Sequence, residues 1–215
     1  GVFILDLCAG GSTNTDTEVA VYDTAACVGA QLACNDDYCG FISHLVFSAT
    51  SGNVYKIRVG GFNGHTGTGT FTVILAPPPP ANDSCLAPTA ISGNGPFAWS
   101  NNSASTDGGA ENCPTPEHDV WFSWVAPSTG SFDASLCAGS STDTVLAIYG
   151  TAGCPGAGTA IACDDDFCAA FGPSQANFTA TSGSTYMIRI GGWHAAEGSG
   201  TFTIAPPAPP PTNDD

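Results

Sequence analysis

Residues 142–149 read TDTVLAIY and residues 15–22 read TDTEVAVY, so one short motif occurs twice in a chain of 215 residues. The correspondence continues along the chain: ACDDDFC at 162–168 repeats ACNDDYC at 33–39, and YMIRIGG at 186–192 repeats YKIRVGG at 55–61. Proline-rich residues and an Asn-Asp pair follow each copy, at Asn82 and Asn213, which gives a period of 213 − 82 = 131 residues. Solenoid repeats have periods of about 20–50 residues, so this period indicates an array of domains.

Each copy has the pattern of short β-strands. Tyr186, Ile188 and Ile190 alternate with Met187 and Arg189, and Gly, Asn, Asp, Ser and Pro fill the gaps between such segments. We expect strands in the complete copy at residues 97–100, 120–125, 131–136, 144–149, 159–163, 176–180, 185–190 and 201–204. The pattern predicts an all-β chain of tandem antiparallel β-sandwiches with a jelly-roll-like topology.

The repeat also predicts the domain organisation. Residues 1–76 form an incomplete sandwich that lacks its first two strands, residues 77–81 a Pro-rich joint, residues 82–204 a complete sandwich, and residues 205–215 a joint and the start of a next repeat. A sandwich without two strands exposes a hydrophobic groove and unpaired backbone edges. We therefore expect more protein to cover the first copy, either in a longer array or as strands donated by a neighbouring molecule.

Composition restricts the environment and the partners. The chain has 19 acidic and three basic residues and a net charge of −16, so nucleic acid and acidic membrane surfaces are poor partners. No stretch has the ~20 apolar residues of a membrane span, and residues 1–6 lack the features of a signal peptide. Ten cysteines beside one methionine favour an oxidising, extracellular or cell-surface location.

We interpret all ten cysteines as disulfide-bonded. The expected pairs are Cys8–Cys27, Cys34–Cys39, Cys137–Cys154, Cys163–Cys168 and Cys85–Cys113. Zinc binding is the alternative, but the chain has neither Cys-x-x-Cys spacing nor companion histidines. Each bridge stabilises a domain by about 2–4 kcal/mol.

Acidic residues between two cysteines form a candidate Ca²⁺ site in each copy, because this hard cation takes several oxygen ligands. The candidate ligands are Asp16, Asp36, Asp37, Asp143, Asp164, Asp165 and Asp166. The alternative is a solvated turn in which Asp side chains cap backbone N–H groups or in which one of them pairs with Arg58 or Arg189.

The few basic residues are expected to be structural. Arg58 and Arg189 stand at matching positions before Gly-Gly, and each should form a cross-strand ion pair or a hydrogen bond with an acidic group. Lys56 corresponds to Met187 and should face solvent.

The sequence contains no catalytic motif. The histidines do not match between copies, and the chain has no Gly-x-Ser-x-Gly, His-Glu-x-x-His or phosphate-loop pattern. They are His44, His65, His118 and His194. We expect no enzymatic activity in this segment.

Tryptophans and acceptor sequons are candidates for contact with sugars. Trp124 alternates with Phe122 and should be a core residue, whereas Trp193 lies in a Gly-rich loop and could bind a sugar or pack at a domain joint. Sequons begin at Asn82, Asn101 and Asn177, which makes N-glycosylation a hypothesis.

DVWF at 119–122, together with the motifs at 142–149, 162–166 and 186–192, resembles the repeated domains of large secreted bacterial proteins, which are similar to pre-peptidase C-terminal domains. The resemblance covers nearly the whole chain. It implies a jelly-roll-like sandwich and an accessory role in surface attachment or substrate binding, sometimes with calcium.

Two functions are consistent with these observations. The first is a structural or adhesive repeat of an extracellular fibre or cell-surface protein, which assembles end to end with copies of itself or within a longer array, and by strand complementation. The second is a calcium-dependent, carbohydrate- or protein-binding accessory domain of a secreted hydrolase. Ca²⁺ is the one candidate cofactor, and glycans are further candidate partners.

Overall fold

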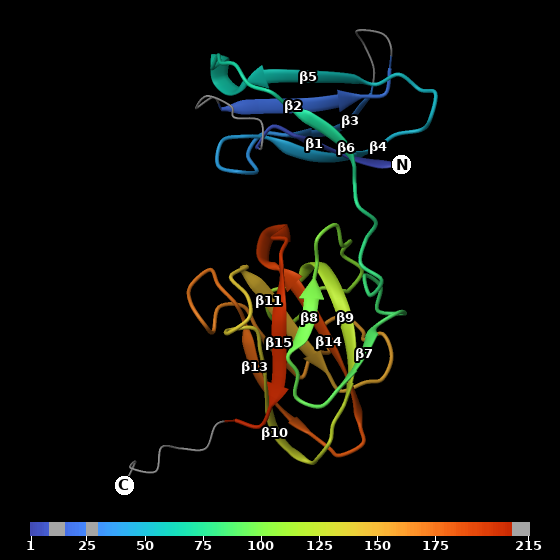
Figure 1. The fold of residues 1–215 in the computed structure, drawn as a ribbon, viewed down its shortest axis with the longest axis vertical. Coiled ribbons are helices and arrows are strands. Elements are labelled where there is room, and N and C mark those ends of the chain that lie inside the picture. Colours follow the sequence, from blue (N-terminus) through green and yellow to red (C-terminus); the bar gives the residue numbers. More distant parts are fainter. Residues whose placement is uncertain (9–15, 25–29, 208–215) are drawn as a thin grey trace. The chain divides into compact units, whose positions relative to one another are not determined.

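The computed structural model describes residues 1–8, 16–24 and 30–207. The chain divides into two compact units, Gly1–Pro77 and Pro78–Asp215, with the boundary inside the Pro-rich joint (Figure 1). Strands dominate both units, and among the described elements are the 3₁₀ turns η2 (Phe62–Gly64) in the first unit and η3 (Trp193–Ala195) in the second. Within the described ranges, no helix is both long and apolar enough to cross a membrane.

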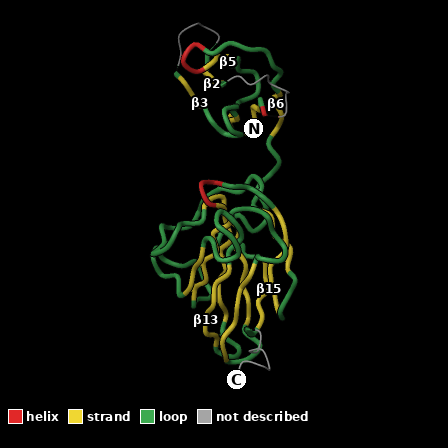
Figure 2. Tube along the Cα trace, turned by 90° about the vertical axis from the view of Figure 1, so that its left-hand side faces the viewer, coloured by secondary structure: helices red, strands yellow, loops and turns green. Residues whose placement is uncertain are grey.

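The second unit is a sandwich of two sheets, whose strands run side by side in Figure 2. Its strands are β7 (Thr89–Ser92), β8 (Phe97–Ser100), β9 (Glu117–Val125), β10 (Gly130–Ser135), β11 (Thr144–Tyr149), β12 (Ala162–Asp164), β13 (Gln175–Ala180), β14 (Thr185–Gly192) and β15 (Ser199–Ala205). One sheet has the order β13-β10-β15-β8 and the other β12-β11-β14-β9-β7. All pairings are antiparallel except that of β7 with β9.

One expected strand needs correction, and one observed strand was not expected. The strand expected at 159–163 begins only at Ala162, because the Thr159 hydroxyl donates to the Gly156 carbonyl over 2.7 Å and closes a turn there. Strand β7 was not expected. It has four residues without clear alternation and pairs in parallel at the edge of a sheet, so its sequence gives little strand signal.

Aromatic side chains fill the core between the two sheets. Trp124 packs edge-on against Phe132 with ring centroids 5.1 Å apart, and Phe122 packs against Phe202 at 4.9 Å. Full burial of one such side chain stabilises the fold by about 1.5–3 kcal/mol. Trp124 is completely buried, which confirms its expected core position.

The outer face of the β9–β14 pair is buried too, and it encloses Arg189. The Nε of Arg189 donates to Oδ2 of Asp119 over 2.7 Å, and its two terminal nitrogens donate to the carbonyls of Gly109 and Pro116 over 2.9 Å. The guanidinium also lies 3.4 Å from Oε1 of Glu111. The expectation of a cross-strand ion pair is therefore confirmed for Arg189.

The first unit repeats part of this sandwich. Its strands are β1 (Val2–Asp6), β2 (Thr17–Tyr22), β3 (Gln31–Asn35), β4 (His44–Ser48), β5 (Lys56–Gly61) and β6 (Thr72–Leu75). The sheets β4-β1-β6 and β3-β2-β5 correspond, strand for strand, to β13-β10-β15 and β12-β11-β14. Among the described residues, the first copy thus has no counterparts of β7, β8 and β9, three strands instead of the expected two.

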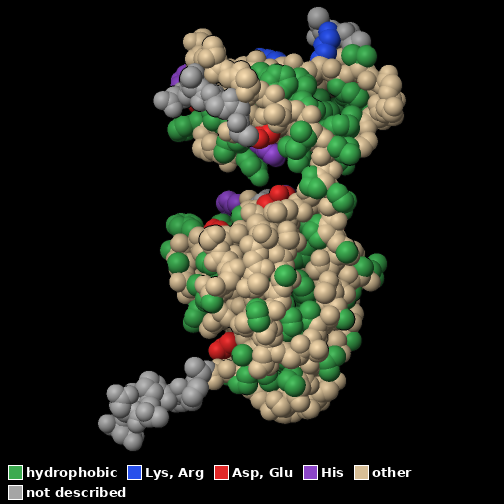
Figure 3. All heavy atoms as spheres, in the orientation of Figure 1, with side chains coloured by type: hydrophobic (Ala, Val, Ile, Leu, Met, Phe, Trp, Pro, Cys, Tyr) green, Lys and Arg blue, Asp and Glu red, His purple; other side chains and the backbone are tan. Residues whose placement is uncertain are grey.

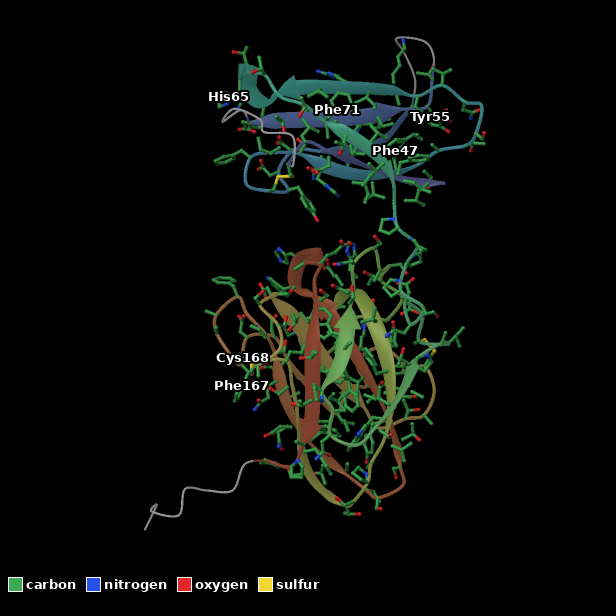
Figure 4. The ribbon with its side chains drawn as sticks, in the orientation of Figure 1. Phe47, Tyr55, His65, Phe71, Phe167 and Cys168 are labelled. Atoms are coloured by element: carbon green, nitrogen blue, oxygen red, sulfur yellow. A yellow bond between two sulfur atoms is a disulfide. The ribbon has the colours of Figure 1, made fainter. Side chains whose placement is uncertain are left out.

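A smaller core holds the first unit together. Leu5, Val19, Val21 and Leu45 are buried between its sheets, and Phe47 packs at their margin with its ring centroid 6.2 Å from that of Tyr55 (Figure 4). Each sheet keeps the strand order of its counterpart, so the missing strands leave β5 and β6 as open edges.

The disulfides connect other cysteines than expected. The bridges are Cys8–Cys39, Cys137–Cys168, Cys85–Cys154 and Cys113–Cys163. Cys34 is an exposed free thiol, and Cys27 lies outside the described residues. Pairing of neighbouring cysteines in the sequence is wrong here because the bridges join distant segments. Cys163 lies in β12 and bonds to Cys113. Cys168 lies in the loop before β13, and the pairing of β13 with β10 brings this loop beside Cys137.

Arg189→Met should destabilise the second unit by about 3–5 kcal/mol, because it leaves Asp119 buried without its cation. Urea unfolding followed by tryptophan emission measures this unit, which contains all four tryptophans. Arg58→Met makes the same change in net charge at the exposed counterpart and should shift that transition by less than about 0.5 kcal/mol. Equal shifts for the two variants would contradict the structural role of Arg189.

Candidate functional site

Three carboxylates converge beside the start of β11 in the second unit. One oxygen from each of Asp143, Asp165 and Asp166 lies within 4.8 Å of the others. The first unit has the same arrangement at Asp16, Asp36 and Asp37. We call these groups the acidic triads. Six of the seven candidate ligands from the sequence are therefore brought together, three in each unit.

A buried pair of hydroxyl side chains positions the triad of the second unit. The Oγ1 of Thr144 lies 3.0 Å from the Oγ of Ser174 and accepts a 3.0 Å hydrogen bond from the Ser174 N–H. The Ser174 hydroxyl also lies 3.0 Å from the carbonyl oxygen of Asp165. This pair fixes the acidic turn against the first residue of β11, next to Asp143.

The first unit uses the same construction. Thr17 Oγ1 lies 2.9 Å from Ser43 Oγ and accepts from the Ser43 N–H over 2.8 Å, and Ser43 Oγ lies 2.9 Å from the Asp36 carbonyl. Sequence reasoning missed both pairs. The repeat could have revealed them, because Ser43 and Ser174 are 174 − 43 = 131 residues apart, which is the period of the chain.

Asp164 does not join the triad. Its Oδ2 accepts hydrogen bonds from the N–H groups of Phe167 and Gln175 over 2.9 and 3.0 Å, so it shapes the turn instead. At the corresponding position, Asn35 Oδ1 accepts from the His44 N–H over 3.0 Å. The Cys137–Cys168 bridge then holds the loop that carries Phe167 (Figure 4).

The triad oxygens are poorly satisfied by the protein. Oδ1 of Asp36, of Asp143 and of Asp165 is buried and has no hydrogen-bond partner. Burial, with the nearby charges of Asp166 and Asp143, raises the pKa of Asp165 to about 6. Burial also raises the pKa of Asp143 and of Asp36, again with help from neighbouring carboxylates. A bound cation would remove both the repulsion and the unmet hydrogen-bonding demand.

The ligand types fit calcium better than a transition metal. Carboxylate oxygens are hard ligands, and Ca²⁺ accepts six to eight oxygens, which leaves positions for backbone carbonyls and water beside the three Asp side chains. Imidazole or thiolate ligands, which zinc prefers, do not join either triad.

Two of the histidines lie beside carboxylates. His44 Nδ1 lies 3.4 Å from Asp6 Oδ1, and His118 Nδ1 lies 3.0 Å from Glu197 Oε1. The hydrogen bond to Glu197 raises the pKa of His118. His194 stacks on Trp193 with ring centroids 4.5 Å apart.

Trp193 is the one tryptophan outside the core, since Trp99, Trp121 and Trp124 are buried. It is half-buried, and its backbone N–H donates to the Asp143 carbonyl over 3.1 Å, next to the triad. The aromatic pair that it forms with His194 therefore borders the candidate metal site.

The three sequon asparagines differ in exposure. Asn101 is fully buried, with Nδ2 donating to the Ala196 carbonyl over 2.9 Å, so a glycan there would require the fold to open. Asn82 Nδ2 donates to the Trp121 carbonyl over 3.0 Å. Asn177 is exposed and bonds only to the side chains of Ser131 and Asp133, so glycosylation at this position stays a prediction.

Residues 81–204, more than half of the chain, match the model of a T9SS-associated family described as galactose binding domain-like. The chain belongs to this family. No curated protein matches the sequence. The match and the β-sandwich fold make this galactose binding domain-like chain an accessory or binding domain of the secreted bacterial type. With four disulfides among its described residues, the chain is extracellular or at the cell surface.

In the presence of a chelator, the second unit should unfold at a lower temperature at pH 7 than at pH 5. The pKa of Asp165 is about 6 in the fold and 3.8 in the unfolded reference, so the folded protein binds this proton more tightly. Protonated Asp165 therefore stabilises the folded state, fully below pH 3.8, and this stabilisation is lost as the pH rises through about 6.

Thermal midpoints from tryptophan emission between pH 4 and 8 test this expectation. Asp165→Asn should raise the midpoint at pH 7 and flatten the profile. A variant with the same pH profile as the wild type would show that Asp165 does not cause it.

Proposed function

We propose that this chain is a structural or adhesive repeat module of an extracellular or cell-surface protein, and that each repeat binds Ca²⁺ at its acidic triad. The observation that carries the proposal is the duplication of the triad. In both units three Asp oxygens lie within 4.8 Å of one another, and in both a buried Thr–Ser pair positions the acidic turn. Strand pairing alone does not require three mutually repelling carboxylates at one place in each repeat.

In this proposal the cation acts as a structural clamp. Asp143 belongs to the segment that enters β11, and Asp165 and Asp166 belong to the turn after β12, so one ion would tie these two segments together. Binding to the folded state alone stabilises it by about 2.7 kcal/mol at a free calcium concentration of 100 times Kd. The chain would thus be most stable in calcium-containing extracellular fluid.

The repeat and the covalent framework support a mechanical role over a catalytic one. Two units of one design follow each other across a Pro-rich joint, which is a semi-rigid spacer. Four disulfides add to the stability of two small cores. We accordingly propose a non-enzymatic module whose partners are further repeats of its own kind, met end to end and through strand complementation at the open edges of the first unit.

A second candidate is a calcium-dependent, carbohydrate- or protein-binding accessory domain of a secreted hydrolase. One observation favours it: the half-buried Trp193 stacks on His194 and borders the second triad through its bond to Asp143. An exposed aromatic face beside a cation can contact the apolar face of a sugar while the ion takes hydroxyl oxygens.

Isothermal titration should find two calcium sites per chain. Asp16→Asn and Asp143→Asn should each leave one site, and the double variant none, because each substitution removes a ligand from one triad. Asp23→Asn, at an exposed position outside both triads, should keep two sites.

Tryptophan emission provides an internal control, since it reports only the second unit. Calcium should raise the thermal midpoint of this transition in wild type and in Asp16→Asn, but not in Asp143→Asn. An unchanged midpoint on addition of EGTA to the calcium-loaded wild type would end the calcium proposal.

Electron microscopy and a glycan array distinguish the two candidates. Filaments with an axial repeat near the length of one or two domains are expected for the structural module. Monodisperse monomers that bind a glycan, with binding lost in Trp193→Ala, would support the accessory domain instead.

A further inference from the structure

The first unit exposes apolar side chains that its counterpart buries. Four side chains of the first unit, two on β5, one on β6 and one just before β6, are 36–47% exposed. The side chains at the corresponding positions of the second unit are at most 1% exposed. The exposed residues are Ile57, Val59, Phe71 and Val73, and their counterparts are Ile188, Ile190, Phe202 and Ile204. Hydrophobic side chains form several patches on the visible face of this unit (Figure 3).

In the second unit, residues of β8 and β9 provide the cover. Phe122 pairs with Ile188, Val120 pairs with Ile190, and the ring of Phe97 packs at a tilt against Phe202 with centroids 5.3 Å apart. In the first unit the same place is a groove of about 540 Å³, bordered by Leu7, Val59, Gly60, His65 and Phe71. Figure 4 marks His65 and Phe71 at this groove.

Gly60 indicates what the groove accommodates. Its counterpart Gly191 must be glycine, because a Cβ there would lie 2.6 Å from the carbonyl oxygen of Glu117 and 2.8 Å from Cβ of Pro116. A Cβ on Gly60 would meet nothing within 4 Å. Within the described first unit, no atom is close enough to require glycine at position 60. A bound backbone that lies against Gly60 as residues 116–117 lie against Gly191 would require it, because a Cβ would then clash with that backbone.

Two polar groups point to the same missing segment. Arg58 is exposed and makes no hydrogen bond or ion pair to a described residue, while its counterpart Arg189 is fully buried against Asp119. Cys34 is an exposed free thiol, and its counterpart Cys163 forms a disulfide with Cys113. Cys113, the partner of Cys163, and Asp119 and Pro116, two partners of Arg189, all lie within residues 113–119.

We propose that the open face of the first unit binds an extended segment with the chemistry of residues 112–125 of a further repeat, sealed by a disulfide to Cys34. The segment would pair with β5 as β9 pairs with β14, place an Asp on Arg58 and cover Ile57 and Val59. This inference rests on the proposed assembly of repeats and names the partner segment.

A second copy of this chain is a poor source of the segment. Its own residues 85 and 113 are already bonded to Cys154 and Cys163, and its β9 is paired along β14. The donor is therefore a repeat of this type whose β9-like segment is not yet engaged.

The covalent step is thiol–disulfide exchange with a small-molecule disulfide. The Cys34 thiolate attacks the oxidant and releases one thiol, and the donor thiolate then attacks the mixed disulfide and releases the second. Two protein thiols lose two protons and two electrons, which reduce the oxidant to two thiols.

A synthetic peptide with the sequence of residues 112–125 tests the proposal in a glutathione redox buffer. Intact mass should show a one-to-one adduct with the whole chain, and peptide mapping should place the bond between Cys34 and the peptide cysteine. A scrambled peptide of the same composition should react about tenfold less, because it lacks the ordered strand contacts. Equal reaction of the two peptides would overturn the proposal.

Variants of the chain sharpen the test. Gly60→Val should leave the unfolding of the free chain unchanged, because the space at its Cβ is open, but should reduce the adduct about tenfold by blocking the donor backbone. Fluorescence anisotropy of a labelled peptide with Cys113→Ser measures binding without the disulfide. Arg58→Gln in the chain and Asp119→Asn in the peptide should each weaken this binding to the same extent. The two changes together should weaken it no further, because each removes the same ion pair. A Gly60→Val chain that captures the peptide as well as wild type would refute the placement.

Sedimentation of the chain without peptide tests the other occupant. A dimer that Gly60→Val abolishes would make a second copy the partner and overturn the proposal, whereas a monomer supports it. Repeating the capture with Asp16→Asn separates this inference from the calcium proposal. Equal capture by this variant and by wild type would show that the donor segment binds independently of the first triad. A wild-type chain that captures the peptide but binds no calcium rejects only the calcium site, and one that binds calcium but does not capture the peptide rejects only the donor segment.

Discussion

The antiparallel pairing of β9 with β14 controls whether a repeat of this protein closes. In the second unit this pairing places Val120, Phe122 and Trp124 over the inner core and Asp119 against the outer, buried Arg189. Both faces of the sheet are thereby buried by one strand. The first unit shows the result of its absence, because the residues that β9 would cover stay exposed although the remaining strand order is kept.

Charge is the second constraint on the fold. With three cationic side chains against 19 acidic groups, the chain can neutralise very few carboxylates internally. Arg189 already forms ion pairs with Asp119 and Glu111. The acidic triads lie away from any described Lys or Arg partner, and burial raises the pKa of Asp165 and of Asp143. An external cation is the simplest compensation that the composition allows.

Sequence reasoning was effective where the repeat or an alternating pattern carries the information. It located β8 and β11 at their observed bounds, the core position of Trp124, and the acidic residues that converge. It failed where contacts are non-local. The disulfide partners depend on which strands lie side by side, and proximity in the chain paired Cys163 with Cys168 instead of Cys113.

Two further features could not be read from the pattern alone. Strand β7 is too short to show alternation, and its parallel pairing with β9 gives it no hairpin partner in sequence. Asp164 and Asp165 are neighbours of the same type, yet one caps backbone N–H groups and the other joins the triad. Only the path of the turn after β12 separates their roles.

The positions of the disulfides give the two units different responses to tension along the chain. A tensile force applied through the Pro-rich joint acts on the second unit at residue 82. The bridge from Cys85 to Cys154 then transmits this force to the loop after β11, so the residues beyond Cys85 are not pulled away one by one. The same pull meets the first unit at β6, and no described bridge lies between Cys39 and the joint. Strands β6 and β5 can therefore be peeled away one hydrogen bond at a time, so the first unit would lengthen under load before the second yields.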